Sequence, residues 1–491
     1  MNKPIRRVSV FCLVLVLALM IRTNWVQGVD AASLNSNNNN RRGTIAAFAY
    51  PRGSIIVGGQ AVTKSVEVNG NNYKYQESFS NGPMYAPVTG YYSPIFGSLQ
   101  YDGNLLESVE DPILSGTAPD LAVNNFEALI TGKPKQGGDV VTTIDPKVQT
   151  AAYQAMTSKG FTGAAVALDP TTGAILGLVS TPSYDPNSFA NGGSSAPYEK
   201  LINDPSQPML NRALRQTYPP GSTFKLVTAA AALETGKVTD INAATDSPNP
   251  YLLPGTNTYL PNESTSDPCL NATMTVALEY SCNTVFAKLG AEVGNARMVQ
   301  EADKFGFNVA RDMPVGVVPS VFPSGLNPSG NAQSSIGQFD TTATPLQMAM
   351  VAAAICNNGS LMTPYLVSEV RAPDQSVVGT PHQATQLSQA TTPQVASEIQ
   401  TMMQQVVQGG TGVTAQIPGV TVGGKTGTAQ NGINNSGNPY AWFVSYAKNS
   451  AGKEIAVAVV VANSSTARGD ISGEELAAPI AKQMMEAYVG Q

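Results

Sequence analysis

The first thirty residues carry the strongest hydrophobic pattern of the chain. Lys3 and two arginines precede an apolar run over Val8–Ile21, and Arg22 then ends the run. A membrane-spanning helix needs about 17–25 residues, so this segment spans a bilayer only if Arg22 extends its charge outward to the interface. We expect residues 1–30 to be a cytoplasmic stub and an uncleaved transmembrane anchor, oriented by its positive residues in the cytoplasmic membrane. A cleaved signal peptide is the alternative, and in both cases the rest of the chain is exported.

Residues 31–139 show a weaker pattern. The stretch 31–42 is polar and rich in asparagine, which predicts a linker. Short runs at Ser54–Val57 and Ala61–Val68 follow, broken by Gly, Asn and Pro, and they are typical of short strands joined by tight turns. Nucleophile, acid and base residues do not gather here, so we expect 31–139 to be a β-rich, non-catalytic spacer or docking domain.

From residue 140 the pattern becomes that of a large α/β domain, 140–491. Five apolar or alternating runs predict strands: Val140–Ile144, Ala164–Leu168, Ala174–Ser180, Ala441–Ala447 and Ile455–Ala462. Asp145 before a proline predicts the start of a helix that runs to about Ser158, and a second long helix is expected from about Gly473 to Tyr488. Strands near both ends of this region indicate one sheet assembled from the two ends of the domain.

Composition excludes several classes of function. Lys and Arg number 28 against 34 Asp and Glu, and no basic stripe follows the first residues, so we expect no nucleic-acid binding. Four cysteines lack a C-x-x-C pair and there is one histidine, His382, so a structural zinc site is not expected. We expect no metal and no cofactor.

The motif S-x-x-K, which can pair a nucleophile with a base, occurs three times. The matches are Ser222–Lys225, Ser445–Lys448 and Ser450–Lys453. Ser445 lies in a predicted strand, where positions three apart face opposite sides, and Ser450 lies in a turn. Ser222 opens a strong helix-forming segment, so Lys225 shares its face and the serine lies where free N–H groups favour negative charge. Lys225 would have to be neutral to act as a base, and an ordinary amphipathic helix with an exposed lysine is the alternative.

The triplet Lys425-Thr426-Gly427 occurs once, between two glycines and Thr428. Small residues suit a strand that another backbone approaches closely, and the lysine and the threonine hydroxyls suit a carboxylate. An edge strand with a protective lysine is the alternative.

The triplet Ser281-Cys282-Asn283 is one of several S-x-N matches. It differs from the others because it lies between two predicted helices, 273–280 and 284–293, on a short connection. Helix capping by Ser281 or Asn283 is the alternative interpretation.

The three triplets together favour a catalytic site over the alternative interpretation of each one alone. Their order, S-x-x-K, S-x-N and K-T-G, is the signature of penicillin-binding proteins and serine β-lactamases. A Ser-His-Asp triad would need His382, which lies in a polar, proline-containing stretch that we expect to be a surface loop. The chain therefore resembles the class B, monofunctional penicillin-binding proteins over nearly its full length, with further similarity at Arg52–Ile55, Tyr85–Gly90 and Ala167–Gly173.

The resemblance implies a fold and a set of roles. The fold would be a β-lactamase-like transpeptidase domain, with an antiparallel sheet flanked by helices, a smaller β-rich N-terminal pedestal of the dimerisation type, and one transmembrane helix. The implied catalytic residues are Ser222 as nucleophile, Lys225 as general base, Ser281 as proton relay, Asn283 as holder of the substrate amide, and Lys425. Thr426, Gly427 and Thr428 would bind the substrate, and the N–H groups of Ser222 and Thr428 would form the oxyanion hole.

The resemblance also implies an activity, which is D,D-transpeptidation of peptidoglycan stem peptides during wall synthesis and division, with inhibition by β-lactams. Proteins of wall synthesis or of the divisome would be partners. A D,D-carboxypeptidase differs only in the acceptor, and a β-lactamase would need a further deacylating base. A non-catalytic β-lactam sensor or wall-binding scaffold is the alternative of another class.

The cysteines depart from the common pattern. Cys282 is the middle residue of the S-x-N triplet and lies thirteen positions from Cys269. In an oxidising compartment the two could form a disulfide that holds the active-site loop. Cys356 lies in an apolar run and is expected to be a buried thiol.

Overall fold

The computed structural model describes residues 3–30, 33–34, 42–69, 73–97, 105–122, 130–132, 135–310, 315–432 and 435–490. Nearly all of the predicted linker 31–42 lies outside these residues. The chain forms two units, Met1–Pro51 with Val66–Gln76, and Arg52–Ser65 with Glu77–Gln491. The predicted boundaries after residues 30 and 139 stay predictions.

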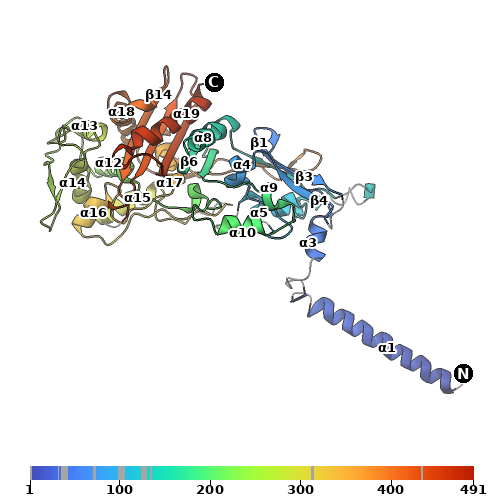
Figure 1. Cartoon of the computed structure of the whole chain (residues 1–491). Helices are drawn as coiled ribbons and strands as arrows, with labels where there is room; N and C mark the ends of the chain where they lie inside the picture. Colours follow the sequence, from blue (N-terminus) through green and yellow to red (C-terminus); the bar gives the residue numbers. More distant parts are fainter. Residues whose placement is uncertain are drawn as a thin grey trace. The chain divides into compact units, whose positions relative to one another are not determined.

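The first unit contains one helix that is long and apolar enough to cross a membrane, α1 (Lys3–Gly28) (Figure 1). It continues through Arg22 and has 26 residues, which at 1.5 Å per residue is about 39 Å. The apolar run alone is shorter than a bilayer core, but the whole helix is longer than the roughly 30 Å required.

The second unit is built on a five-stranded antiparallel sheet. Its order is β14 (Thr421–Ala429), β15 (Tyr440–Lys448), β16 (Glu454–Asn463), β6 (Thr162–Leu168) and β7 (Ile175–Thr181). Strands from the end of the chain thus pair with strands from residue 162 onward, which confirms the predicted sheet. The strand that carries the K-T-G triplet, β14, lies at one edge of this sheet.

The two faces of this sheet are covered by different helices because successive side chains alternate between them. Val166, Val444 and Ala458 belong to a core that includes α12, α14 and α17. Phe443 and Val457 belong to a second core formed with α8 and α19, which lie together in Figure 1. The bounds of these helices are α8 Pro146–Ser158, α12 Lys225–Glu234, α14 Asn283–Val293, α17 Pro345–Cys356 and α19 Ala478–Val489.

A second five-stranded sheet has the order β12-β11-β5-β1-β2. The predicted strand at Val140 is present as β5 (Asp139–Thr142), but it pairs in parallel with β1 (Ile55–Val57) and antiparallel with β11 (Val367–Arg371). It therefore does not join the central sheet. The other strands of this sheet are β2 (Gln60–Ala61) and β12 (Val377–Val378).

A buried charge cluster lies beside this second sheet. The Arg52 guanidinium donates to Glu107 at 2.9 Å and to Asp111 at 2.5 Å, and it stacks over the Tyr92 ring. Glu77 approaches the Nε of Arg52 only to 3.9 Å, which is too far for a hydrogen bond. Burial and the charge of Glu107 together raise the pKa of Glu77 to about 8, although the charge of Arg52 lowers this pKa. The distance between Arg52 Nε and the Glu77 carboxyl would allow an ion pair. Because the pKa of Glu77 is about 8, however, its carboxyl is a neutral acid at pH 7.

Further helices and strands make up the rest of the described chain. They are α3 Arg42–Ala47, β3 Thr63–Glu67, β4 Tyr75–Phe79, α4 Gly82–Thr89, α5 Leu106–Val109, α6 Asp111–Leu114, η1 Pro119–Leu121, α9 Asn187–Ala190, α10 Ala196–Ile202, α11 Arg212–Arg215, η2 Gly221–Phe224, β8 Tyr251–Leu252, β9 Tyr259–Leu260, α13 Met274–Glu279, α15 Asn295–Lys304, α16 Pro328–Ser334, β10 Ser360–Met362, β13 Gln386–Gln389, α18 Pro393–Gln408, η3 Val413–Ala415, η5 Arg468–Asp470 and η6 Gly473–Ala477. The predicted C-terminal helix is thus a π-helical turn, η6, followed by α19.

Candidate active site

Ser222 lies in the tight turn η2 that leads directly into α12. Gly221 before it has a φ of +54°, and a Cβ there would lie 3.1 Å from that of Ala429 on β14. A side chain at position 221 would be strained on both counts, so glycine allows the serine-bearing turn to approach the sheet edge. Ser222 is half-buried, and within the described part of the chain its hydroxyl makes no hydrogen bond.

Lys225 is fully buried at the start of α12. Its Nζ donates to the Ser281 carbonyl oxygen at 2.6 Å and to the Asn283 Oδ1 at 2.8 Å, with the Ser281 hydroxyl 3.3 Å away. Burial lowers the pKa of Lys225 well below its ordinary value, and the charge of Lys425 lowers it further. The lysine therefore meets the condition that a general base requires, which is to be neutral.

The S-x-N triplet joins α13 to α14, as its predicted position between two helices implies. Ser281 has a φ of +60°, in the left-handed region that a non-glycine residue adopts at an energetic cost. Asn283 is the first residue of α14, and its Nδ2 donates to the Pro261 carbonyl at 3.4 Å. Cys282 is joined to Cys269 by a disulfide with a Cα–Cα distance of 5.6 Å, so the expected link at the active-site loop is present.

Lys425 lies on β14 directly opposite Val444 of β15. Opposite residues in an antiparallel pair point to the same face, so Lys425 points into the core that also holds α12. It is fully buried, its Nζ donates to the Thr426 carbonyl at 3.2 Å, and burial lowers its pKa to about 7. A second cationic group thus lies close enough to influence Lys225.

The rest of the triplet lies along the same edge strand. Thr426 is buried and its hydroxyl lies 2.7 Å from that of Thr411. A Cβ on Gly427 would lie 3.0 Å from the carbonyl oxygen of Pro220, so this glycine lets the turn that carries Ser222 pack against β14. Thr428 follows on the strand and is half-buried. Sequence reasoning missed Thr411, because the sequence around it, Gly-Gly-Thr-Gly, has the composition of an ordinary turn.

The alternatives to these residues lie elsewhere. His382 is exposed and stacks on Tyr365, and Ser445 is buried within β15. Across the described ranges no group of three His, Cys, Asp or Glu side chains could hold a metal ion. Cys356 is a buried free thiol, as expected.

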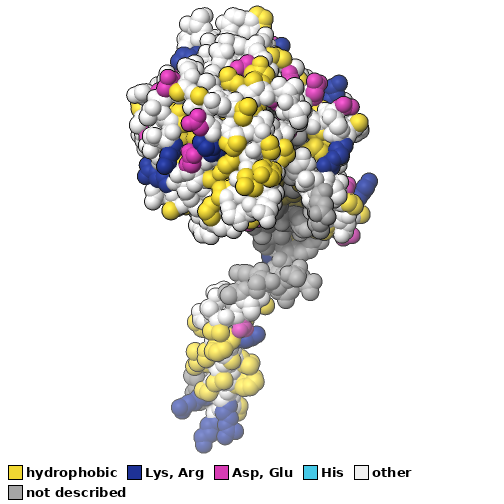
Figure 2. Space-filling model, turned by 90° about the vertical axis from the view of Figure 1, so that its left-hand side faces the viewer, with side chains coloured by type: hydrophobic (Ala, Val, Ile, Leu, Met, Phe, Trp, Pro, Cys, Tyr) yellow, Lys and Arg dark blue, Asp and Glu magenta, His cyan; other side chains and the backbone are white. Residues whose placement is uncertain are grey.

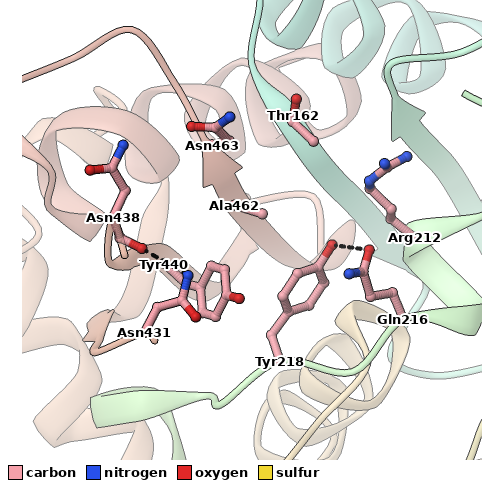
Figure 3. Close-up of a pocket in the computed structure, with 9 residues that line it drawn as sticks. All are labelled: Thr162, Arg212, Gln216, Tyr218, Asn431, Asn438, Tyr440, Ala462 and Asn463. Carbon is pink, nitrogen blue, oxygen red and sulfur yellow. Dashed lines mark hydrogen bonds between the residues drawn. The ribbon is translucent and has the colours of Figure 1, made fainter. Parts of the chain in front are cut away.

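Two further features of the surface lie in this part of the molecule. Exposed apolar side chains stand near the S-x-N segment, with Tyr259, Leu270 and Tyr280 between 36% and 68% exposed. Figure 2 shows apolar side chains gathered on the end of the molecule where α13, α14 and α16 lie. A polar pocket of about 320 Å³ is lined by residues that include Tyr218, and Figure 3 shows that Tyr218, Gln216 and Arg212 face Asn431 and Tyr440 across it.

A family model described as "Penicillin binding protein transpeptidase domain" matches residues 163–486. The chain belongs to the penicillin-binding protein transpeptidase family. A second model, "Penicillin binding protein A dimerisation domain", matches residues 52–140 of this penicillin-binding protein. The family and the fold class expected from the three triplets are therefore confirmed.

Named relatives of this penicillin-binding protein match over its full length. Peptidoglycan D,D-transpeptidase PbpA of Mycobacterium tuberculosis is 37% identical over 501 residues, which is 99% of both chains. The protein of the same name from Mycolicibacterium smegmatis is also 37% identical, with 99% of both chains covered. The solved ceftriaxone acyl-enzyme complex of penicillin-binding protein A from M. tuberculosis is 36% identical, has a TM-score of 0.84 and covers 91% of this chain and 100% of its own.

Proposed function

We propose that this penicillin-binding protein is a peptidoglycan D,D-transpeptidase that forms a serine acyl-enzyme at Ser222. The observation that carries the proposal is the set of contacts around Lys225, a buried lysine with a lowered pKa between the S-x-N triplet and Lys425. The full-length likeness to named D,D-transpeptidases supports the same reaction, and the relatives captured with β-lactams support inhibition by these drugs.

Substrate binding is assigned to the edge strand. The donor stem peptide, which ends in D-Ala-D-Ala in the family, lies along β14 with its terminal carboxylate at Lys425, Thr426 and Thr428. Lys425 is suited to this because its ammonium group is buried beside the strand, where an opposite charge interacts strongly. The bound carboxylate also favours the charged form of Lys425.

Acylation then proceeds at Ser222. The serine Oγ attacks the carbonyl carbon of the penultimate D-Ala while its proton passes to neutral Lys225, and the N–H groups of Ser222 and Thr428 stabilise the oxyanion. The peptide bond breaks, and Ser281 relays a proton from Lys225 to the leaving nitrogen of the terminal D-Ala. Asn283 holds the substrate amide.

Among the described residues, Lys225 bonds to Ser281 and Asn283 and not to Ser222. Ser222 and Lys225 are three residues apart on one helical face, so a change of lysine rotamer on substrate binding brings the base to the hydroxyl. Loose contacts of this kind are common before substrate binds.

An amine of a neighbouring stem peptide resolves the acyl-enzyme and forms the cross-link, and water in its place would make the protein a D,D-carboxypeptidase. We further propose that α1 anchors the protein in the cytoplasmic membrane with the catalytic unit outside, because basic residues precede the apolar helix. Proteins of wall synthesis or division are the further partners that the family implies.

The test is covalent labelling of the detergent-solubilised full chain with a fluorescent penicillin, beside Ser222→Ala. We expect a stable adduct that mass spectrometry places on Ser222 and that the variant lacks. A folded protein with no adduct would overturn the nucleophile assignment. Incubation of a pentapeptide donor with and without an amine acceptor then separates cross-linking from carboxypeptidation, because only a transpeptidase forms the amide product.

A further inference from the structure

A short loop between α18 and η3 contacts both the K-T-G strand and the helix that precedes the S-x-N triplet. Thr411, in the segment 409–412, places its hydroxyl 2.7 Å from that of Thr426 on the K-T-G strand. Its backbone N–H donates to the carbonyl oxygen of Glu279 at 3.3 Å. Glu279 ends α13, two residues before Ser281. One residue therefore links the strand that carries the K-T-G triplet to the helix that leads into the S-x-N triplet.

Glycines allow this loop to lie so close to its neighbours. A Cβ at Gly410 would stand 2.6 Å from the Glu279 carbonyl oxygen. A Cβ at Gly412 would stand 3.3 Å from the ring of Phe443, the residue paired with Thr426 across the sheet. The backbone of the loop therefore lies directly against Glu279 and Phe443, and the half-buried Thr411 side chain is the polar group that it presents between them.

We propose that Thr411 is a positioning residue for the site that recognises the free terminal carboxylate of the donor, and that it acts by donating its hydrogen to the Thr426 oxygen. The inference rests on the proposed function, because it assigns a partner to Thr426 in its carboxylate-binding role. The 2.7 Å contact allows either hydroxyl to donate, and in the proposed arrangement the Thr426 hydrogen stays free to point at the carboxylate. Hydrogen bonds in such a chain polarise one another, so an anion at the end gains more than one isolated hydroxyl would give.

The test compares acids with their neutral derivatives on the full-length protein. Second-order acylation constants are measured for a penicillin and its methyl ester, with wild type, Thr411→Val and Thr411→Ser. We expect Thr411→Val to slow the acid by about three- to tenfold, the effect of one neutral hydrogen bond, and the ester by less than about twofold. Thr411→Ser, which keeps the hydroxyl, should keep the wild-type ratio of acid to ester.

Thr414→Val is the matched control, because Thr414 lies in the adjoining η3 turn and its hydroxyl donates to the carbonyl of Glu474 at 3.0 Å. It should leave the acid-to-ester ratio unchanged. Equal slowing of acid and ester by Thr411→Val, or no slowing of either, would overturn the proposal; Thr411→Ala provides the same comparison should the valine variant fail to fold. Wild-type labelling at Ser222 tests the proposed function separately, so the two failures are distinguishable.

Discussion

The disulfide between Cys269 and Cys282 provides the sharpest perturbation of the site. Both cysteines are fully buried, and Cys282 lies between Ser281 and Asn283, the two residues that accept hydrogen bonds from Lys225. The variant Cys269→Ala/Cys282→Ala removes the cross-link while it keeps the surrounding chain.

The expected loss of stability follows from the length of the loop that the disulfide closes. Its cysteines are 13 residues apart, and for a loop of this size the chain-entropy relation gives about 3 kcal/mol at 25 °C. The matched control is Cys356→Ala, which deletes a buried thiol of the same volume that closes no loop. Denaturant unfolding should therefore show the double variant less stable than this control by on the order of 2–3 kcal/mol.

The expected loss of activity has a different cause. Without the link, the left-handed backbone of Ser281 and the start of α14 lose a covalent constraint, and Lys225 loses the fixed position of its two acceptors. Acylation by penicillin should slow by on the order of tenfold or more, since small misplacements of catalytic groups are costly. A folded double variant that is acylated at the wild-type rate would refute the reasoning that the disulfide holds the S-x-N triplet. A stability equal to that of Cys356→Ala would refute the entropic part.

Three further predictions concern charge and close packing. Lys425→Met removes a cation that lowers the pKa of Lys225, so the low-pH limb of the acylation profile should move to higher pH, measured from rates across a pH series. Glu77 has its pKa raised by burial to about 8, so the stability of its protonated form is complete below its ordinary pKa and is lost as pH rises through about 8; Glu77→Gln should remove this contribution, so the unfolding free energy of the variant should fall less over that range than that of the wild type. Gly473→Ala places a Cβ 2.1 Å from the Trp442 carbonyl oxygen, so the melting temperature should fall sharply, whereas Gly452→Ala, with open space around its Cβ, should cost only the strain of its positive φ.

Each of these has a contradicting outcome. An unmoved pH limb in Lys425→Met would mean that burial alone keeps Lys225 neutral. A difference in unfolding free energy between wild type and Glu77→Gln that stays constant as pH rises from the ordinary pKa of glutamate to about 8 would place Glu77 among the ionised groups of the Arg52 cluster. Equal melting temperatures for the two glycine variants would show that the contact at Gly473 relaxes freely.

Strongly patterned strands and motif residues were readable from the sequence. The apolar runs at Ala164–Leu168 and Ile455–Ala462 form neighbouring strands of the central sheet because alternating side chains fill a core on each face. The strand at Val140 was also found, but its place in the second sheet was not. A short apolar strand suits any buried position, and its partners are chosen by contacts far along the chain.

The site shows the same division between local pattern and distant contact. Spacing alone places Ser222 and Lys225 on one helical face, whereas burial of both lysines depends on β14 packing against η2, the turn before α12, from some 200 residues away. The left-handed backbone of Ser281 could not be foreseen, because serine gives no sign of a positive φ. Thr411 escaped notice because its function rests on two contacts with distant residues and not on any local motif.

The order of strands in the central sheet has a consequence for biogenesis. β6 and β7 are made in the first half of the chain, but the second strand that pairs with β6 is β16, which ends at Asn463. The edge strand that carries Lys425 joins the sheet only through β15 and β16. A nascent chain therefore carries Ser222 for more than 200 residues of synthesis before the cleft around it can close. During that interval the early hairpin exposes an unpaired edge, which is the kind of surface that chaperones bind and that promotes aggregation. Truncation of even the last strand should thus yield a protein that retains every signature residue and binds no penicillin.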